Sequence, residues 1–517
     1  MKKLVTAEVM QQLDKMVIEE LGIKSTTLME NAAQKVFDMI VKYEEDVKGK
    51  KITVVCGKGN NGGDGLLVAQ HLKNAGADTT VFVLAKKTAI SADSKKALTK
   101  LTKVYKKTAF VEKIGDFTLS DPDLIVDAIF GTGFNSNPEG LFYDVIKQMN
   151  ESKAKIYSID TPSGLHGSTG NIEDIAVKAT RTITLAYGKV GLYVNDGYTY
   201  SGDVDVVDIG FPESVNEEIQ DTRMLTEVID TIGAFKDREL TVDKKEFGKV
   251  FNFSGSLSMP GAAVLSSTAA LRTGTGLLKL GIPMNISASV STIFPEIMSL
   301  PLGYAQPGFT SNNAEKEVLK GYKWCDACLV GPGLSVHPET KKVVRRLIQK
   351  SSSKPIVLDA DALNIMAEQN ELFEKMGPNV VLTPHNSEMA RMINTSKELF
   401  LLERIEIVTQ KAIDWNCYII LKGTPTLIAY PDGRMFTHIN KNPAMAVGGI
   451  GDTLSGIIVS LLGQKIPMEK AIVTALYIHS IAGRYATEKY GEVSMLPSDL
   501  IKEIPNAIKY LRSLGDK

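Results

Sequence analysis

The sequence predicts an α/β protein of two domains, the first built on a mostly parallel, doubly wound sheet and the second on a further α/β run. Short apolar, β-rich runs alternate with helical patterns along nearly the whole chain, and this alternation is typical of parallel sheets covered by helices. Most of these runs end in a glycine or polar turn. The periodic pattern fades into charged sequence near residues 212–245, which predicts one domain over residues 1–215 and another over residues 225–517.

The overall composition narrows the class of protein. The chain has 517 residues, of which 44% are hydrophobic and 23% charged, as in ordinary globular proteins. Its formal net charge of −1 provides no overall field for nucleic acid or an anionic membrane. No apolar run is long enough to span a bilayer, and the first residues lack the apolar core of a signal peptide. We therefore expect a cytoplasmic protein with no nucleic-acid and no membrane partner.

The first domain begins with helical sequence over residues 4–46, where apolar positions recur at helical spacing. A helix is also expected near residues 66–75. The expected strands cover residues 52–56, 79–85, 124–133, 155–164, 182–187 and 203–210. Because the carboxyl ends of parallel strands meet at one crevice, we expect the functional residues there.

The second domain repeats this pattern. Its clearest strands are expected over residues 249–256, 327–334, 355–364, 379–388 and 418–430. An apolar helix is expected over residues 453–462, and the tail over residues 467–514 is mostly helical.

The glycine-rich stretch of residues 57–62 follows the first strand and satisfies GxGxxG. A dinucleotide fingerprint needs an acid about 20 residues further on, but the next strand ends in Lys86-Lys87, and no P-loop lysine follows either. Asn60, Asn61 and Asp64 stand among these glycines. That composition suits a polar ligand held by backbone and side chains, with or without a cation; a simple tight turn is the alternative.

Charged residues end three other segments of this half. Asp127 precedes IFGTG, Asp160 precedes TPSG, and Lys189 lies in YGKVG. A single Asp at a strand end is usually a turn former or a helix cap. Three charged strand ends beside glycine turns predict one shared site instead.

Asp452 is the candidate catalytic group of the second half. Gly448, Gly449 and Gly451 surround it just ahead of a helix, where free backbone N–H groups and the helix dipole favour an anion. A carboxylate in this position is suited to take a proton from a hydroxyl that attacks or receives a phosphoryl group. A glycine-capped helix with a solvated Asp is the alternative.

These motifs resemble a known family. CGKGNNGGDG, VDAIFGTG and IDTPSG look like NAD(P)H-hydrate epimerase motifs, and FSGS, LDADALN, LKGTPT and NPAMAVGGIGD are similar to those of ADP- or ATP-dependent NAD(P)H-hydrate dehydratases. Together they resemble the fused NAD(P)H-hydrate repair enzymes over nearly the whole chain. The resemblance implies a Rossmann-like epimerase domain over residues 1–215 and a ribokinase-like dehydratase domain over residues 225–517.

In the first domain the resemblance implies a site for hydrated NADH or NADPH and for potassium. Asp160 would be the catalytic acid or base, with Lys189 beside it. Potassium would be held by Asn61, Asp127 and Ser163. The residues that would hold the substrate are Asn60, Asn61, Gly62, Gly63, Asp64, Gly131, Thr132, Gly133, Phe134, Asn135, Ser136, Asn137 and Asp160.

In the second domain the resemblance implies that Asp452 is the catalytic carboxylate and that Mg²⁺ bridges the phosphates of ADP or ATP. The hydrate would contact Ala262, Ala263, Gly333, His385 and Asp452. The adenine nucleotide would contact Lys422, Gly423, Thr424, Pro425, Thr426 and Gly451. We also expect a homo-oligomer.

The sequence departs from the family beside the second site. The family's Pro-Gly after TPH is Asn386-Ser387 here, which places the details of substrate binding in doubt. Two other functions stay open at this point. One is a ribokinase-like small-molecule kinase with a regulatory, nucleotide-binding N-terminal domain. The other makes the N-terminal half a nucleotide-sensing or protein-binding module without catalysis.

Overall fold

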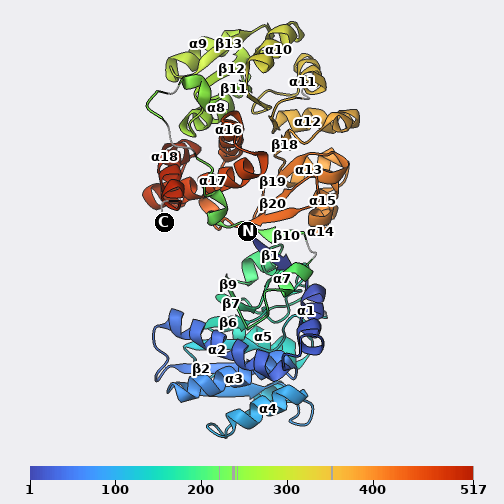
Figure 1. Cartoon of the computed structure of the whole chain (residues 1–517), viewed down its shortest axis with the longest axis vertical. Coiled ribbons are helices and arrows are strands. Elements are labelled where there is room, and N and C mark those ends of the chain that lie inside the picture. The colour runs from blue at the N-terminus through green and yellow to red at the C-terminus, as the bar shows by residue number, and fades with distance from the viewer. Residues whose placement is uncertain (135, 220–221, 236–238, 242, 351–352, 516–517) are drawn as a thin grey trace. The chain divides into compact units, whose positions relative to one another are not determined.

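The computed structural model describes residues 1–134, 136–219, 222–235, 239–241, 243–350 and 353–515 (Figure 1). The chain divides into two compact units. One is Lys2–Arg223, and the other combines Met1 with Met224–Lys517. Each is described separately below as the N-terminal and the C-terminal unit.

The N-terminal unit is built on a parallel sheet. Its strands are β1 (Lys2–Val5), β2 (Lys51–Cys56), β3 (Asp78–Val83), β4 (Ala109–Phe110), β5 (Leu124–Ala128), β6 (Lys155–Ile159), β7 (Arg181–Leu185), β8 (Gly188–Lys189) and β9 (Asp203–Val207). Within the described residues, the main sheet has seven strands in the order β4-β3-β2-β5-β6-β7-β9. The strand order reverses between β2 and β5, which is where a doubly wound sheet opens its binding crevice. β1 pairs in parallel with β8.

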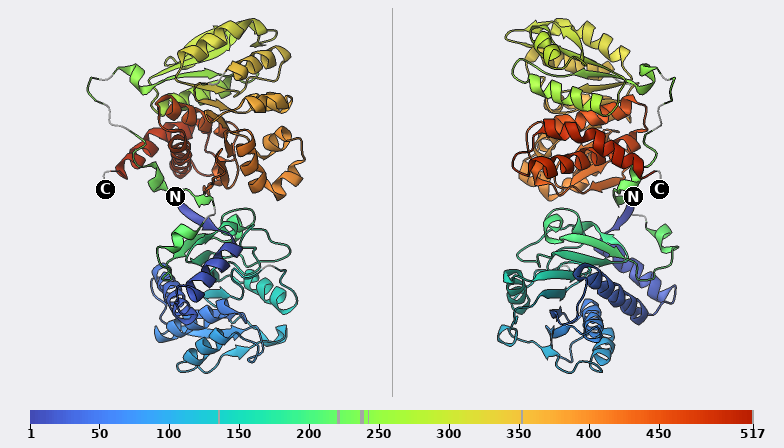
Figure 2. Two further views of the ribbon diagram at one scale, coloured as in Figure 1. Left: turned by 45° about the vertical axis from the view of Figure 1, so that its right-hand side comes forward. Right: turned by 90° about the vertical axis from the view of Figure 1, so that its left-hand side faces the viewer.

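Helices cover both faces of this sheet, as Figure 2 shows from two further sides. The helices are α1 (Ala7–Glu19), α2 (Ser25–Glu44), α3 (Asn60–Asn74), α4 (Ala92–Leu101), α5 (Leu141–Glu151), α6 (Gly197–Tyr200) and α7 (Val215–Glu218), with short turns η1 (Ile114–Asp116) and η2 (Val190–Leu192). Successive residues of β2 belong to different cores: Val54 packs with residues of α2 and α3, and Val55 with residues of α5. Burial on both faces explains the nearly continuous apolar strands.

The C-terminal unit has a second mostly parallel sheet. Its strands are β10 (Arg223–Leu225, which begins at the division), β11 (Lys249–Phe253), β12 (Leu277–Pro283), β13 (Met298–Leu302), β14 (Tyr304–Ala305), β15 (Phe309–Thr310), β16 (Ala327–Val330), β17 (Ile356–Leu358), β18 (Val380–Leu382), β19 (Tyr418–Leu421), β20 (Thr426–Ala429) and β21 (Met435–His438). The order runs β13-β12-β11-β16-β17-β18-β19-β20-β21, parallel up to β19 and antiparallel from there on. Here the order reverses between β11 and β16.

Two helices bury the centre of this sheet. The longer helices are α8 (Pro260–Arg272), α9 (Met284–Ile293), α10 (Glu315–Trp324), α11 (Pro338–Lys350), α12 (Asp361–Ala367), α13 (Asn386–Met392), α14 (Lys397–Leu402), α15 (Arg404–Asp414), α16 (Ile450–Gly463), α17 (Met468–Tyr490) and α18 (Pro497–Ser513); the short turns are η3 (Val228–Thr231), η4 (Lys244–Phe247), η5 (Asn312–Ala314), η6 (Asn370–Lys375) and η7 (Pro443–Met445). Ile457 and Ile458 of α16 and Ala269 of α8 are essentially inaccessible to solvent. This packing holds the start of α16, and with it Asp452, against the sheet.

The predicted two-domain α/β class is confirmed, but several elements differ in type or extent from the prediction. The strand expected over 418–430 is two antiparallel strands, because the chain turns over Lys422–Pro425. The helix expected near 66–75 begins at Asn60, so most of the glycine-rich stretch is helical. The helical region expected over 4–46 begins with β1 and is interrupted between α1 and α2.

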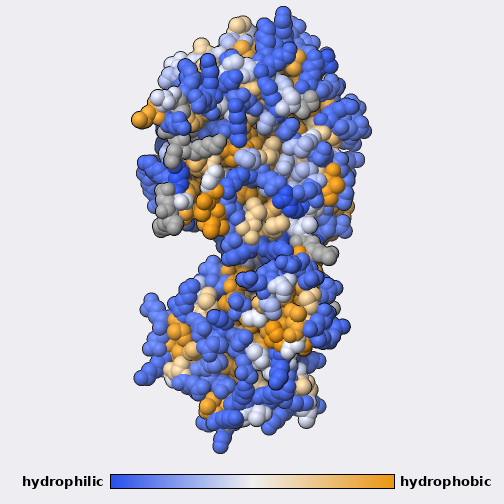
Figure 3. All heavy atoms as spheres, in the orientation of Figure 1, coloured by the Kyte–Doolittle hydropathy of each residue, from blue (hydrophilic) through white to orange (hydrophobic). Residues whose placement is uncertain are grey.

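The surface seen in Figure 3 is mostly hydrophilic, with separate apolar patches. Exposed large apolar side chains include Leu399, Leu402 and Val493. No helix in the described part of the chain is both long and apolar enough to cross a membrane.

The contact between α16 and α8 generates a stability prediction. A Cβ on Gly456 would lie 2.2 Å from the Ser266 carbonyl oxygen, whereas a Cβ on Gly261 of α8 would meet open space. We expect Gly456→Ala to force the helices apart at a cost of about 1–3 kcal/mol, more than the helix propensity that alanine gains. Thermal unfolding should show a Tm several degrees lower for this variant. The matched control, Gly261→Ala, should keep or raise the Tm, and an equal loss in both would contradict this explanation.

Two candidate active sites

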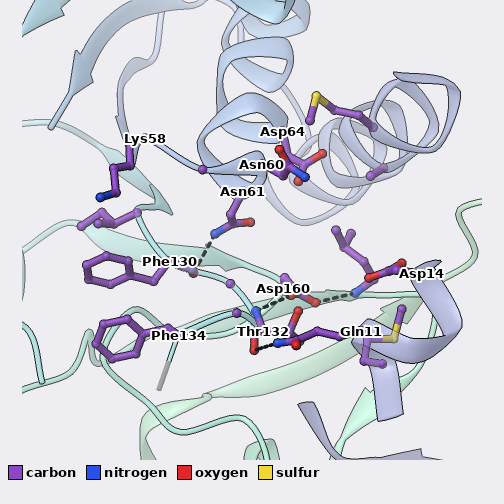
Figure 4. Close-up of a pocket in the computed structure, with 18 of the residues that line it drawn as sticks. Gln11, Asp14, Lys58, Asn60, Asn61, Asp64, Phe130, Thr132, Phe134 and Asp160 are labelled. Atoms are coloured by element: carbon purple, nitrogen blue, oxygen red, sulfur yellow. Dashed lines mark hydrogen bonds between the residues drawn. The ribbon is translucent and has the colours of Figure 1, made fainter. Parts of the chain in front are cut away.

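The first candidate site is a cavity of about 960 Å³ in the N-terminal unit. This volume is in the usual range for small-molecule sites. The start of α3, the segment after β5 and the inner face of α1 line it (Figure 4). It therefore opens where the strand order reverses, as the topology of the sheet predicts.

An ion pair between Asp160 and Lys189 forms the floor of this cavity. Asp160 follows β6 with a left-handed backbone (φ 69°), which turns its carboxylate back into the site. Lys189 is 0% exposed, and its Nζ donates to Asp160 Oδ1 at 2.6 Å and to the Leu185 carbonyl at 2.7 Å. The Thr132 backbone N–H donates to Asp160 Oδ2 at 3.1 Å. Both charged groups are thus held in place before any ligand binds.

Behind the cavity, Asp127 is completely buried at the end of β5. Ser158 Oγ, Ser163 Oγ and the backbone N–H groups of Ser163 and Ile129 donate to its carboxylate. Burial raises the pKa of Asp127 in spite of these donors. Within the described residues, no basic side chain lies within ion-pair distance of Asp127. Its carboxylate is therefore stabilised by neutral hydrogen-bond donors and not by a positive charge.

The structure brings most of the predicted substrate residues to the cavity. Those that line it are Asn60, Asn61, Asp64, Gly131, Thr132, Gly133, Phe134, Ser136, Asn137, Asp160 and Lys189. The side-chain oxygens of Asn61 and Asn137 are buried without a partner among the described residues, so they remain available to a ligand. Asn135 lies outside the residues that the structure describes.

Gly62 and Gly63 have a packing role instead of facing the cavity. A Cβ on Gly62 would lie 2.1 Å from the Gly57 carbonyl oxygen, and one on Gly63 would lie 2.7 Å from Met29 Cε. The glycines let α3 start directly against β2 and α2, which turns Asn61 toward the Phe130 carbonyl, to which its Nδ2 donates at 2.7 Å. They therefore act on the site through the position of their neighbours.

Two residues of α1 that the sequence reasoning missed also reach the cavity. Gln11 Nε2 donates to the Thr132 carbonyl at 3.2 Å, and Asp14 lines the wall beside Asp160 (Figure 4). Burial raises the pKa of Asp14 to about 6, against the attraction of Lys189 and with a smaller contribution from Asp160. A signal was present: Asp14 lies four residues after Met10, on the buried face of α1.

The second candidate site surrounds Asp452 in the first turn of α16. The helix begins after Gly449, whose φ is 96°, and a Cβ there would lie 2.7 Å from Leu265 Cδ1. Glycine at this position therefore permits both the turn and the packing. Burial, reinforced by the Asp359 carboxylate, raises the pKa of Asp452 to about 7.

Lys422 links the predicted motifs of this site. Its Nζ donates to Asp359 Oδ1 at 2.6 Å and lies 3.9 Å from Glu388 Oε2. A Cβ on Gly451 would lie 3.4 Å from the same nitrogen. Four of the predicted motifs thus meet around the ammonium group of Lys422: LDADALN, TPH, LKGTPT and GGIGD. Asp359 and Glu388 were not among the predicted site residues.

The other predicted residues have distinct places. His385 caps α13, where its Nδ1 accepts from the backbone N–H groups of Ser387 and Glu388, and burial lowers its pKa. A Cβ on Gly333 would lie 3.0 Å from Ala262 Cβ, so these two share one wall. Ala263 is 0% exposed in the core, so only Ala262 of the two alanines presents surface.

The remaining predicted nucleotide residues form the turn between β19 and β20. They are Gly423, Thr424, Pro425 and Thr426, directly after Lys422. The Thr424-Pro425 bond is cis, and Thr426 Oγ1 donates to the Gly423 carbonyl at 3.2 Å.

Known proteins match the chain over nearly its whole length. A bifunctional NAD(P)H-hydrate repair enzyme of Moorella thermoacetica is 36% identical over 98% of this chain and 97% of its own. The chain belongs to this family. Relatives with the same description include those of Salinibacter ruber (34% identical, 97% and 95% covered) and Vibrio cholerae (30% identical, 96% and 97% covered).

Two family models and a solved structure each match one part of the chain. A model described as NAD(P)H-hydrate dehydratase matches residues 252–506, and one described as YjeF-related protein N-terminus matches residues 25–191. An ADP/ATP-dependent NAD(P)H-hydrate dehydratase from Bacillus subtilis, co-crystallised with ATP and Mg²⁺, is 26% identical with a TM-score of 0.48. That comparison covers 56% of this chain and 98% of the Bacillus protein.

The raised pKa of Asp452 predicts a pH-dependent effect on stability. Because the folded-state pKa of about 7 lies above the ordinary value of 3.8, the carboxyl group ionises more readily in the unfolded state, and stability falls progressively as the pH rises between these values. Asp452→Asn removes this loss. We expect its Tm advantage over the wild type to grow from pH 5 to pH 8, by the equivalent of about 2 kcal/mol. Differential scanning calorimetry tests this, with Glu398→Gln on α14 as control. A Tm difference that does not change with pH would contradict the assignment.

Proposed function

We propose that the chain repairs hydrated NADH and NADPH in two steps. The N-terminal unit, residues 1–215 of the predicted domain, would interconvert the R and S forms of the hydrate. The C-terminal unit, residues 225–517, would dehydrate the S form with ADP or ATP. The observation that carries this proposal is that each unit has its own ion pair between a lysine and a buried aspartate at the carboxyl ends of parallel strands. Family membership supports the pairing of these two activities.

In the N-terminal unit, we assign to Asp160 the exchange of a proton with the hydroxyl group on C6 of the hydrated ring. The ion pair with Lys189 and the Thr132 N–H hold its carboxylate in one orientation. Such positioning lowers the entropy cost of proton transfer. Asn60, Asn61 and Asn137 supply amide groups that suit the polar parts of a dinucleotide.

In the C-terminal unit, the difficulty is that hydroxide is a poor leaving group. Transfer of a phosphoryl group to the C6 hydroxyl makes phosphate the leaving group. Asp452, with a pKa of about 7, is suited to accept the hydroxyl proton. The N–H groups at the start of α16 and the Lys422 ammonium are suited to stabilise charge on the transferring phosphoryl group.

Potassium fits the first site. Asn61 Oδ1 is buried without a partner, and Asp127 is a buried carboxylate without a basic neighbour in the described ranges. Asn61, Asp127 and Ser163 would hold the ion, which supplies a positive charge behind the substrate site. For Mg²⁺, no three His, Cys, Asp or Glu side chains of the described residues are grouped to hold a metal. We assign Mg²⁺ to the nucleotide phosphates, as is usual for this ion.

We further propose that the protein works as a homo-oligomer and that it is located in the cytoplasm. We also propose that it prefers ADP to ATP, because the fused arrangement of the two domains resembles bacterial enzymes. Light scattering on the purified protein and a comparison of the two nucleotides in the dehydration assay test these points directly.

Removing the carboxylate of one site should reduce the activity of that site and leave the activity of the other site unchanged. We expect Asp452→Asn to slow dehydration of the S hydrate by about 10²–10⁴-fold, because the proton acceptor is lost. Epimerisation should stay at the wild-type rate. Asp160→Asn should give the reverse result. Dehydration is followed by the returning absorbance of the reduced ring, and epimerisation by chromatography of the two hydrates.

The two variants serve as controls for each other. Loss of both activities in either variant would indicate misfolding or one shared site. A stable phosphorylated product on vitamin-like alcohols, with no action on the hydrates, would support a small-molecule kinase instead. Epimerisation at the spontaneous rate in the wild type would support a non-catalytic N-terminal module.

The potassium assignment predicts a stabilising effect as well as a kinetic one. Potassium should raise the Tm of the wild-type protein relative to tetramethylammonium at the same ionic strength, because ligands that bind only the folded state stabilise it. The rate of epimerisation should rise in parallel. Asp127→Asn should lose the difference between the two cations, and a Tm difference that persists in this variant would rule out Asp127 as a ligand.

A further inference from the structure

We propose that Asp14 is a second catalytic acid–base residue of the epimerase site and acts together with Asp160 on the C6 hydroxyl of the hydrate. The inference rests on the proposed epimerase function and deepens it. Neither the GxGxxG-like stretch nor the strand-end aspartates point to α1, so the cavity itself identifies Asp14 as part of the site.

The geometry brings two carboxyl groups from different elements to one cavity. Asp160 enters from the end of β6, and Asp14 enters from α1 (Figure 4). Gln11, three residues before Asp14 and one turn earlier on the helix, is tied to the Thr132 carbonyl by a hydrogen bond of 3.2 Å. This bond connects α1 to the segment that also donates to Asp160. The two carboxyl groups are thus presented to the same space by a common framework.

Asp14 is not engaged in holding the fold together. No hydrogen bond or ion pair of its carboxyl group occurs within the described residues, although the side chain is partly buried. Asp127 differs, since four donors surround its carboxylate. A desolvated carboxyl group without a partner lowers stability, and such groups concentrate at sites of function.

The carboxyl groups of Asp14, Asp64 and Asp160 have different charged neighbours. The charged groups that face Asp14 are Lys189 of β8, Asp160 after β6 and Asp64 of α3. Burial raises the pKa of Asp14 to about 6, and burial with Asp160 and Asp14 nearby holds the pKa of Asp64 well above its usual range. Asp160 has the ammonium group of Lys189 at 2.6 Å. A carboxyl group with a raised pKa beside a carboxylate that is paired with an ammonium group is the arrangement that a donor–acceptor pair needs.

The chemistry balances with these two groups and one water molecule. The lone pair of the ring nitrogen N1 forms a double bond to C6 while the C6–O bond breaks, and Asp14 gives its proton to the departing oxygen, which leaves as water. Water then attacks the other face of the planar C6, the N1–C6 π electrons return to nitrogen, and Asp160 takes the proton. Asp14 is left ionised and Asp160 protonated. The enzyme in this protonation state can catalyse the reverse reaction, or the two carboxyl groups can return to their starting protonation states by proton exchange with solvent.

The test compares Asp14→Asn with the wild-type full-length protein on separated R and S hydrates. We expect kcat for epimerisation to fall by about 100-fold or more while KM changes by only a few-fold, because the amide cannot donate the proton. The wild-type kcat/KM should fall as the pH rises above about 6, and the variant should lack this limb. Asp14→Glu should restore part of kcat. Glu19→Gln, which removes an exposed carboxylate from the same helix, is the matched control and should keep full activity.

Two further measurements separate catalysis from folding and from the proposed function. The Tm of Asp14→Asn should equal or exceed that of the wild type, because a desolvated carboxyl group is removed. In H₂¹⁸O each wild-type inversion should place one ¹⁸O at C6. Wild-type kcat and an unchanged pH profile in Asp14→Asn, or inversion without ¹⁸O uptake, would overturn the inference. A wild-type protein that does not epimerise the hydrates at all would instead overturn the proposed function.

Discussion

An ion pair between a lysine and a buried aspartate is the interaction on which both sites depend. Lys189 and Asp160 meet at 2.6 Å in the N-terminal unit, and Lys422 and Asp359 at 2.6 Å in the C-terminal unit. Moving two charges out of water costs free energy that their attraction repays only with good geometry and additional hydrogen bonds. The additional bonds are present, from Lys189 to the Leu185 carbonyl and from Ser455 to Asp359. Each ion pair therefore holds its two charged side chains in a defined position at the carboxyl ends of the strands.

A second carboxyl group lies beside each pair and has no ammonium group of its own. Asp14 in one unit and Asp452 in the other are largely desolvated, and their pKa values are raised to about 6 and about 7. Groups with such values can change protonation state near neutral pH, as acid–base catalysts must. The same physical arrangement, an ion-paired carboxylate next to an isolated one, thus recurs on two different sheets and is suited to different reactions.

Glycines make these arrangements possible by close backbone packing. Gly62 lets α3 begin against the Gly57 carbonyl, and Gly449 lets α16 begin against Leu265 and Pro497. A side chain on Gly62 would collide with the backbone that follows β2, and one on Gly449 would collide with residues of α8 and α18. The glycine motifs therefore encode the placement of neighbouring groups, Asn61 and Asp452, more than contacts of their own with a ligand.

The amino-acid sequence by itself determined the α/β class and the place of Asp127, Asp160 and Lys189 at the ends of strands, because these follow from local periodicity and from the topology of parallel sheets. It also indicated Asp452 as a candidate group, because glycines surround this carboxylate just ahead of a helix. Only the tertiary structure decided that the 418–430 segment turns back on itself, that Ala263 belongs to the core, and that Asp14, Asp359 and Glu388 join the sites. Those features depend on contacts between residues far apart in the chain. Burial and charge pairing, which set pKa values and available surfaces, arise only when such residues meet.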